Sequence, residues 1–378
     1  MLCRRGAAPR VGIQSRGRGA KLQPAALACG LNSLLTCLPG LFARPSPMEK
    51  IAMLGGGSWA TALTKILSEN GARVDWWLRS KDDVQHLLRT GHNARYLSAV
   101  QFDRNLVYPT TDLTDAVAEA DWLVLAVPAA FVQPVLDKLG RDALRHKTGV
   151  ISAIKGMIPG KNVLVTDYVQ ERFRLPASRL GVIAGPCHAE EVALEKQSYL
   201  TIGSPDVSGL AQGFCQLLRN RYVSAHPAAD LDGIEYCAVM KNIIALTGGI
   251  AHGLGYGDNF LAVLVSNAVQ EIRRFLQAIS PQPRDLSASA YLGDLLVTAY
   301  SQFSRNRTFG NMVGRGYSVK SAQLEMNMIA EGYYAVKSIH ELNRQLKVNM
   351  PIVTAAYNVL YERIAPAVEL EILKEKLR

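Results

Sequence analysis

The sequence predicts an α/β protein in two parts, in which a doubly wound parallel sheet is followed by an all-helical domain. Three observations support this prediction. Between residues 50 and 225, short apolar runs alternate with amphipathic stretches, as strands and crossover helices do. From residue 230 onward helical periodicity dominates and few strand candidates remain. The length of 378 residues also exceeds what one hydrophobic core usually supports.

The stretch 50–60 organises the first part. An apolar run ends there in three glycines, and an amphipathic stretch begins at Ser58. Gly55 and Gly57 occupy the first two positions of a G-x-G-x-x-G/A fingerprint, and Ala60 takes the third. The first glycine permits a sharp turn, the second lets a pyrophosphate approach the backbone, and the helix start favours its negative charge. The pattern predicts a dinucleotide site.

Two further positions bear on the cofactor. The stretch 73–78 has the character of a strand, and Arg79 stands at its end, where an arginine accommodates the 2′-phosphate of NADP. Asp75, the acidic alternative that would bind the ribose of NAD, falls in mid-strand. The sequence therefore favours NADPH and leaves NAD open. Phe131 follows the strand 121–127 near the expected cofactor position, although a core aromatic residue fits the same pattern.

The remaining elements follow from periodicity. Further strands are expected at 149–153, 180–184, 199–203 and 222–225. Helices are expected at 58–70, from 81, and at 129–139, 162–173, 207–218, 231–254, 259–279, 293–303, 321–346 and 352–365. Because ligands lie at the carboxyl ends of parallel strands, Lys155 and Gly185 are candidate site residues.

The helical part holds polar residues within apolar stretches. Lys241 and Asn242 lie inside such a stretch, and Asp294 precedes another. A buried charge is costly unless it is paired or its pKa shifts, so a lysine near a carboxylate is a candidate proton donor. Arg305 offers a planar fork for a phosphate or a carboxylate. Each residue alone fits an interhelical salt bridge, but together, opposite a dinucleotide domain, they favour catalysis.

The positive charge is concentrated at one end of the chain. The formal net charge is +10, and seven of these excess charges lie in residues 1–47, which contain no Asp or Glu. We therefore expect no nucleic-acid partner. The six cysteines form no C-x-x-C pair and no metal-binding spacing. This usage favours reduced thiols, a cytoplasmic location and no bound metal.

Residues 1–47 are unlike the rest of the chain, and three interpretations compete. A basic start followed by an apolar patch is typical of targeting peptides. A membrane span is the second interpretation, but Asn32 and Pro39 interrupt the patch. The third, which we favour, is that translation begins at Met48 or that the preceding residues are a disordered extension. We expect no stable membrane insertion.

The chain from Met48 to about Glu362 resembles the bacterial NAD(P)-dependent glycerol-3-phosphate dehydrogenases. Seven segments in order carry the resemblance: GGGSWATA (55–62), AVP (126–128), AIKG (153–156), AGPCHAE (184–190), VMKN (239–242), GDLLVT (293–298) and SRNRTFG (304–310). The resemblance implies a Rossmann-like domain at 48–228 and a helical, 6-phosphogluconate dehydrogenase-like domain for substrate and catalysis at 229–378. Apolar helices of the second domain could line a core or an interface, and we expect a homodimer.

The resemblance also implies an activity and a site. The activity is reversible reduction of dihydroxyacetone phosphate to sn-glycerol 3-phosphate with NADP or NAD as cofactor, which supplies phospholipid synthesis. Lys241 is then the acid/base, and Lys155 and Asp294 bind the substrate and orient Lys241. The other implied substrate contacts are Gly185, Ser304, Arg305 and Asn306. The implied cofactor contacts, besides Gly55 and Gly57, are Ser58, Trp59, Arg79, Phe131, Lys155, Ala189, Arg305 and Glu331.

Two departures and two alternatives accompany the resemblance. Cys187 stands where relatives often have Thr or Ser, and His188 stands where they often have an aromatic residue, so we assign His188 no catalytic role.

The first alternative function is that of a β-hydroxyacid or 6-phosphogluconate-type dehydrogenase, which shares the two-domain plan. A non-catalytic NADPH-binding regulator is the alternative outside the enzymes, and loss of the buried lysine or aspartate would favour it.

Overall fold

The computed structural model describes residues 48–326 and 330–378, which belong to one compact unit. Our expectations for residues 1–47 lie outside the described residues. The strands are β1 Lys50–Leu54, β2 Arg73–Trp77, β3 Val107–Thr110, β4 Trp122–Leu125, β5 Gly149–Ser152, β6 Met157–Ile158, β7 Val163–Leu164, β8 Leu180–Ala184, β9 Ser198–Gly203 and β10 Val223–Ala228.

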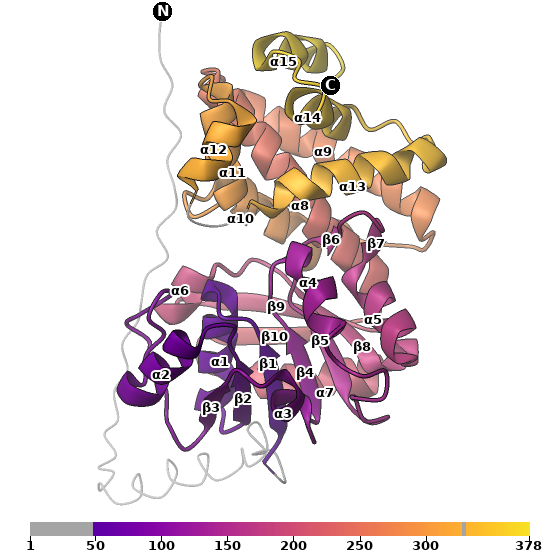
Figure 1. Cartoon of the computed structure of the whole chain (residues 1–378). Helices are drawn as coiled ribbons and strands as arrows, with labels where there is room; N and C mark the ends of the chain where they lie inside the picture. The colour runs from indigo at the N-terminus through magenta and orange to yellow at the C-terminus, as the bar shows by residue number, and fades with distance from the viewer. Residues whose placement is uncertain (1–47, 327–329) are drawn as a thin grey trace, which may run out of the picture. The chain divides into compact units, whose positions relative to one another are not determined.

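The helices divide between the two parts of the chain (Figure 1). Those among the strands are α1 Ser58–Glu69, α2 Lys81–Thr90, α3 Leu113–Val117, α4 Ala129–Leu136, α5 Val165–Phe173, α6 Ala189–Ala193 and α7 Gln212–Leu218. Those after the last strand are α8 Leu231–Gly253, α9 Asp258–Ile279, α10 Asp294–Tyr300, α11 Arg305–Gly314, α12 Val319–Glu325, α13 Glu331–Leu346, α14 Pro351–Leu360 and α15 Pro366–Lys374.

Eight strands form one sheet in the order β3-β2-β1-β4-β5-β8-β9-β10. All neighbouring pairs are parallel except β8 with β9. The first six strands have the doubly wound order that we expected, in which the connections reverse direction between β1 and β4. The antiparallel pair departs from the fully parallel prediction. The connection from β8 to β9 contains only the five-residue helix α6, about 7.5 Å long, which is too short to cross back along the sheet.

Apolar side chains cover both faces of the sheet, as parallel strands require. Along β1, Ile51 and Met53 belong to the hydrophobic cluster on one face, and Ala52 and Leu54 belong to the cluster on the other. All four are fully buried. This double coverage explains why the strand has the continuous apolar sequence from which it was predicted.

Helix α8 is the centre of the helical part. It contacts α9, α10, α11, α13 and α14 as well as strand β8. Its apolar residues lie all round the helix, which is typical of a helix enclosed by others. Among the described residues it is the one helix long and apolar enough to cross a membrane, yet its most apolar window is completely buried inside the protein. The same composition therefore suits a core helix here.

Glycines allow α8 and α11 to pack backbone against backbone. A Cβ atom at Gly249 would overlap the carbonyl of Arg307, and one at Gly310 would overlap the carbonyl of Leu246. Gly253 and Gly314, four residues farther along each helix, meet the partner backbone in the same way. The crossing fixes the start of α11 relative to the middle of α8, which carries Lys241.

Several expected elements differ in the structure. The helix expected at 162–173 begins only at Val165, because Asn162 has a left-handed backbone (φ 55°) and residues 157–164 form the β6–β7 hairpin. The helix expected at 321–346 is two helices, since Met326 is extended. Those expected at 293–303 and 352–365 are correct only in part, because α10 and α14 end earlier, at Tyr300 and Leu360.

Some elements were not predicted. Strand β3 lies at the sheet edge and contains Pro109, which is why its pattern is weak. Helix α11 was missed although Ser304 marks its start: the Ser304 hydroxyl accepts a hydrogen bond from the Arg307 N–H at 3.3 Å. Helix α15 begins at Pro366, a residue suited to a first helical turn.

The glycine crossing gives a stability prediction. Gly310→Ala should lower the free energy of unfolding by about 3 kcal/mol, because the added methyl group forces two helix backbones apart. Urea unfolding followed by circular dichroism measures this. Gly140→Ala is the control, since nothing lies within 4 Å of the added atom, and it should change stability by less than about 0.5 kcal/mol. Equal effects at the two positions would contradict the proposed close packing.

Candidate active site

The carboxyl ends of the strands bring several predicted site residues to one edge of the sheet. Gly55 follows β1, Arg79 follows β2, Lys155 follows β5 and Gly185 follows β8. These strands are mutually parallel, so their ends share an edge. In Figure 1 the helical part lies at this edge. Contacts between α8 and β8 bring the two parts together there.

A buried cluster of one carboxylate and two ammonium groups joins the two parts. Lys241 on α8 forms an ion pair with Asp294 at the start of α10, and the two side chains are 4% and 2% exposed. Lys155 Nζ lies 3.6 Å from the other oxygen of the same carboxylate. The Gly185 N–H also donates to Asp294 at 3.4 Å. One carboxylate thus contacts residues that follow β5 and β8 and a residue of α8.

The cluster splits the pKa values of its members. Burial, together with the positive charge of Lys155, lowers the pKa of Lys241 to about 7 although Asp294 opposes the shift. Burial also acts on Lys155, but the carboxylate of Asp294 outweighs it and raises the pKa of Lys155. Burial disfavours the charge of Asp294 too, and the two lysines nevertheless hold its pKa below the ordinary value. Lys241 is thus an amine that can exchange a proton near neutral pH.

Cys187 borders this cluster. Its thiol donates to the carbonyl of Gly185 at 3.1 Å, and Lys155 Nζ lies 4.0 Å from its sulfur. Burial is the main cause that raises the pKa of the Cys187 thiol. The position that departs from the family pattern therefore lies beside a predicted substrate-binding lysine. His188 lies outside the cluster, with its ring against Phe303.

The glycine turn has the geometry that a dinucleotide needs. Gly55 adopts a left-handed backbone (φ 126°), and a Cβ there would lie 2.5 Å from the carbonyl of Ala126 at the end of β4. No atom lies within 4 Å of a Cβ placed on Gly57, which precedes α1, so the helix start is open to a phosphate. The buried indole N–H of Trp59 finds no acceptor among the described residues. An open helix start and an unsatisfied donor fit a bound nucleotide.

Two side chains that hold this turn in place were not predicted from the sequence. The Trp76 indole N–H donates to the carbonyl of Gly55 at 2.5 Å. The Asn93 amide donates to the carbonyl of Gly56 at 3.1 Å and to the Thr61 hydroxyl at 2.8 Å. Both side chains are buried. Neither residue belongs to the glycine fingerprint, so only the fold reveals their role.

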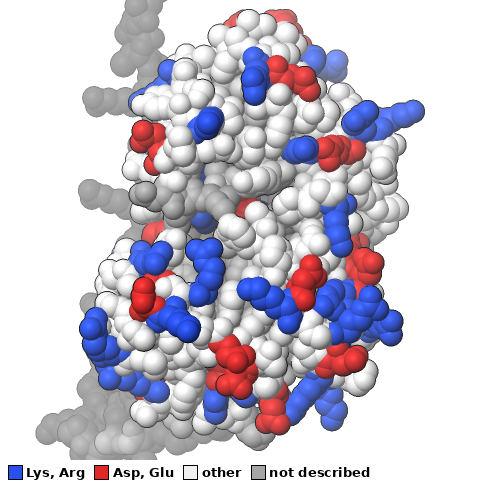
Figure 2. All heavy atoms as spheres, viewed as in Figure 1, with Lys and Arg blue, Asp and Glu red and all other residues white. Residues whose placement is uncertain are grey.

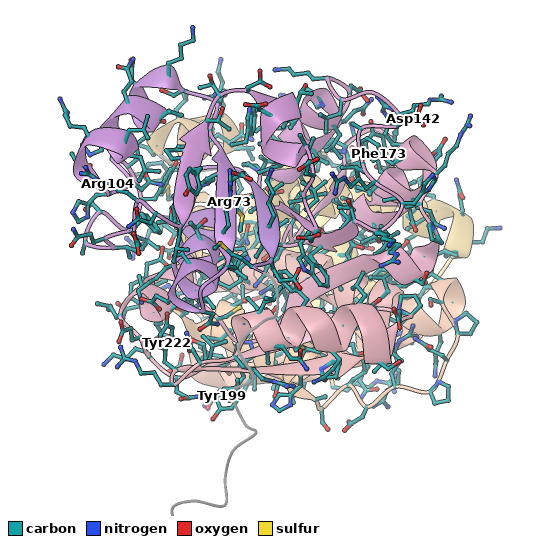
Figure 3. All side chains as sticks on the ribbon, turned by 90° about the horizontal axis from the view of Figure 1, so that it is seen from below. Arg73, Arg104, Asp142, Phe173, Tyr199 and Tyr222 are labelled. Carbon is teal, nitrogen blue, oxygen red and sulfur yellow. The ribbon has the colours of Figure 1, made fainter. Side chains whose placement is uncertain are left out.

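Arg79 and Asp75 lie at different levels of β2. Asp75 forms ion pairs with Lys50 at 3.4 Å and Arg73 at 3.1 Å, and both partners are first residues of their strands. Figure 3 looks onto this end of the sheet and shows Arg73 there. Arg79 is exposed beyond the opposite end of β2, beside Ser80, the N-cap of α2. Asp75 is therefore engaged away from the predicted nucleotide edge.

The predicted phosphate-binding residues surround the start of α11. Ser304 is its buried N-cap, and Arg305 is its exposed first residue. Asn306 is buried and accepts the Gly332 N–H at 2.8 Å. Gly332 also lies close to the residue after Lys241, since a Cβ atom on Gly332 would be 2.6 Å from the carbonyl oxygen of Asn242. The start of α11 and the helix that carries Lys241 therefore meet at Gly332.

Glu331 links the two parts at the remaining cofactor positions. Its carboxylate accepts the Ala129 N–H at 3.0 Å, and thereby caps α4, which carries the half-exposed Phe131. Burial raises the pKa of Glu331 to about 7, although the Ala129 N–H and the charge of Arg305 lower it. Ala189 is buried at the start of α6. Glu331, Ala189 and Phe131 thus lie in the first turns of α13, α6 and α4.

Family models match most of the chain. The N-terminal model of NAD-dependent glycerol-3-phosphate dehydrogenase matches residues 50–209, and the C-terminal model matches residues 230–371. The glycerol-3-phosphate dehydrogenase (NAD(P)+) of Staphylococcus aureus is 36% identical over 321 residues, which cover 84% of this chain and 95% of that protein. The chain belongs to the NAD-dependent glycerol-3-phosphate dehydrogenase family. It is an NAD(P)-dependent oxidoreductase, as the sequence motifs predicted.

Solved structures agree with this membership. The glycerol-3-phosphate dehydrogenase of Coxiella burnetii matches with a TM-score of 0.81 and 28% identity, over 87% of this chain and 99% of that one. The Plasmodium falciparum glycerol-3-phosphate dehydrogenase has a TM-score of 0.75 at 22% identity, over 86% and 94% of the two chains, and supports the fold. The predicted fold class, a Rossmann-like domain with a helical C-terminal domain, is confirmed.

The described surface on one face carries charges of both signs. Figure 2 shows Lys and Arg side chains interspersed with Asp and Glu side chains on this face.

Four of the predicted site residues form one group in the structure. The structure brings Lys155, Gly185, Lys241 and Asp294 into direct contact and links Glu331 to α4.

Proposed function

We propose that this enzyme reversibly reduces dihydroxyacetone phosphate to sn-glycerol 3-phosphate and that NADPH is its preferred cofactor. The observation that carries the proposal is the buried cluster of Lys241, Asp294 and Lys155 at the carboxyl edge of the sheet. Family membership supports the substrate pair. A small phosphorylated substrate also suits the basic and polar residues at the start of α11.

Lys241 is the proposed acid/base. Reduced nicotinamide, when bound, supplies hydride to the ketone. The ketone oxygen then develops negative charge, which the Lys241 ammonium stabilises and neutralises by giving up a proton from Nζ. The lowered pKa of Lys241 makes this transfer easier, and the same amine accepts the proton in the reverse reaction. Asp294 orients Lys241 and keeps the buried charges balanced.

Positioning falls to the neighbouring residues. Lys155 stays protonated because its pKa is raised, and it binds the substrate as a fixed positive charge. The backbone of Gly185 approaches the substrate. Ser304, Arg305 and Asn306 hold the phosphate, and the N-terminal end of α11 favours its negative charge. Holding the phosphate fixes the reacting carbon, which is a major source of rate enhancement.

The cofactor is proposed to lie along the strand ends. Gly55, Gly57 and Ser58 would hold the pyrophosphate, and the free indole N–H of Trp59 would donate to an acceptor on the nucleotide or substrate. Arg79 would bind the 2′-phosphate of NADPH, since Asp75 is engaged elsewhere. The proposed list of contacts is completed by Phe131, Lys155, Ala189, Arg305 and Glu331.

The proposal also covers the roles of the two domains, the cellular location, the oligomeric state and the use of the product. Residues 48–228 bind the dinucleotide and residues 229–378 complete the substrate site. The enzyme works in the cytoplasm as a homodimer, without stable membrane insertion or a nucleic-acid partner, and its product supplies phospholipid synthesis. The family resemblance and the charge distribution support these assignments.

Lys241→Ala tests the reaction and the proposed acid/base together. Wild-type enzyme with dihydroxyacetone phosphate should consume NADPH, followed by the reduced nicotinamide absorbance. The variant should lose at least about 100-fold in kcat, the scale of a general acid, with NADPH binding nearly unchanged. Lys138→Ala, at an exposed lysine, is the control. Wild-type enzyme that prefers non-phosphorylated hydroxyacids or fails to turn over would overturn the proposed substrate, and an active variant would overturn the role of Lys241.

The two reaction directions should respond oppositely to pH. Ketone reduction needs protonated Lys241, so kcat should fall as pH rises through about 7. Glycerol 3-phosphate oxidation needs the neutral amine, so kcat should rise over the same range. Initial rates at saturating substrates and cofactor between pH 5.5 and 9, roughly the range around a pKa tuned to neutrality, measure both limbs. Limbs that move in the same direction would argue against one shared acid/base.

Arg79→Ala should separate the two cofactors. The Kd for NADPH should rise by about 10- to 100-fold, since a charge-assisted contact to the 2′-phosphate is lost, while the Kd for NADH stays nearly constant. Titration of cofactor fluorescence measures both constants. Arg145→Ala, at a surface ion pair with Glu119, is the matched control. Unchanged NADPH affinity in Arg79→Ala would exclude this residue as the phosphate contact.

A further inference from the structure

Glu235 is a buried carboxylate on the catalytic helix that takes no part in the proposed chemistry. It is fully buried on α8, six residues before Lys241. Its carboxylate accepts the Val165 N–H at 3.1 Å and the Thr166 hydroxyl. These residues form the first turn of α5, whose own N-cap residue, Leu164, provides no side-chain cap. Glu235 therefore caps a helix of the sheet part from within the helical part.

The capped helix is joined directly to Lys155. Lys155 leads into the β6–β7 hairpin, in which Met157 pairs with Leu164, and α5 begins at the next residue. The hairpin side chains Met157 and Leu164 belong to the hydrophobic cluster of the helical part. In Figure 1, β6 and β7 lie beside the helical part. The hairpin is thus a segment of the first part that packs into the core of the second.

Helix α8 holds both ends of this segment. Asn242 donates to the carbonyl of Lys155 at 2.8 Å, and Glu235 accepts from Val165 and Thr166. Residues seven apart share one face of a helix and lie about 10 Å apart along its axis. A second contact reinforces the far end, where the Asn162 amide donates to Glu341 of α13 at 2.6 Å.

We propose that Glu235 is a positioning residue for the reaction: its contacts with α5 fix the β6–β7 hairpin against α8, and so set the distance from Lys155 to Asp294 and Lys241. The inference rests on the proposed function, because it assigns Glu235 a role through those residues. The chain offers a direct comparison. Glu271 on α9 is also buried and caps α14 through the N–H groups of Ile352 and Val353, both at 2.9 Å.

The test compares alanine variants at both glutamates with a glutamine variant at Glu235. Glu235→Ala should lower kcat by about 10- to 100-fold, since a displacement near 1 Å can cost about 100-fold, while the Kd for NADPH changes by less than about twofold. Glu271→Ala should lower thermal stability comparably and leave kcat within about twofold, because distant sites act independently. Glu235→Gln, which retains a carbonyl acceptor for Val165 N–H, should recover most of the kcat. All rates are measured well below each variant's unfolding temperature.

The pH profile separates positioning from general loss of structure. Lys155 lowers the pKa of Lys241, so a looser hairpin should let that pKa rise and move the limb for ketone reduction to higher pH in Glu235→Ala alone. A pH profile of Glu235→Ala that matches the wild type, or equal kcat losses in Glu235→Ala and Glu271→Ala, would overturn the inference. Should Glu235→Ala fail to fold, Thr166→Val decides, because it removes the hydroxyl donor to Glu235: a kcat loss with the limb shifted to higher pH supports the role, and wild-type kcat or an unshifted limb refutes it. Failure of wild-type enzyme to reduce dihydroxyacetone phosphate would instead refute the proposed function.

Discussion

The architecture depends on one buried carboxylate. Asp294 faces two ammonium groups, and each comes from a different part of the chain. An unpaired charge at such depth would cost several kcal/mol, so α10, α8 and the end of β5 must meet for any of the three charges to be tolerated. The ion cluster is therefore a structural requirement as well as a chemical device. It lowers the pKa of Lys241 and raises that of Lys155, so the two neighbouring lysines differ in how readily they lose a proton.

Close backbone packing against α8 also positions the neighbouring helices of the second part. The close packing of α8 and α11 at their glycines fixes the position of the first turn of α11, which contains Arg305 and Asn306. The Asn306 side chain accepts a hydrogen bond from the Gly332 N–H in the first turn of α13. Glu331 in the same turn accepts from the Ala129 N–H and so caps α4 in the sheet part. Successive helix starts are thus satisfied by side chains from other elements. Each such contact orients a predicted site residue.

Local patterns predicted the parts of the fold that have local causes. The strand–turn–helix at Gly55 depends on an apolar run, a left-handed glycine and an open helix start, all visible in the sequence. The pairing of Lys241 with a carboxylate followed from the cost of burying a charge. The sequence order of the segments also carried the family assignment, which the family models confirm.

Contacts between distant residues explain what could not be predicted. The two-residue strands β6 and β7 are too short to show periodicity, and residues such as Glu235 and Met157 become meaningful only through partners in the other part. At the start of α13, Glu331 accepts from the Ala129 N–H of α4, and the Gly332 N–H donates to the Asn306 side chain of α11. Trp76 and Asn93 brace the glycine turn from outside its motif. The two residues of each contact are too far apart in the sequence for a local pattern to reveal that they interact.

The all-round apolar character of α8 has a consequence for how the chain is made. Ribosomes complete α8 at Gly253, but the helices that enclose it, ending with α13 and α14, come later in the chain. At about 5–20 residues per second, roughly 5–20 s pass between the completion of α8 and that of α13. During that interval α8 can pack on strand β8, which is already made, but the helices that cover its other sides are still incomplete. The order of the helices along the chain therefore leaves the apolar surface of α8 only partly covered until α13 and α14 are made.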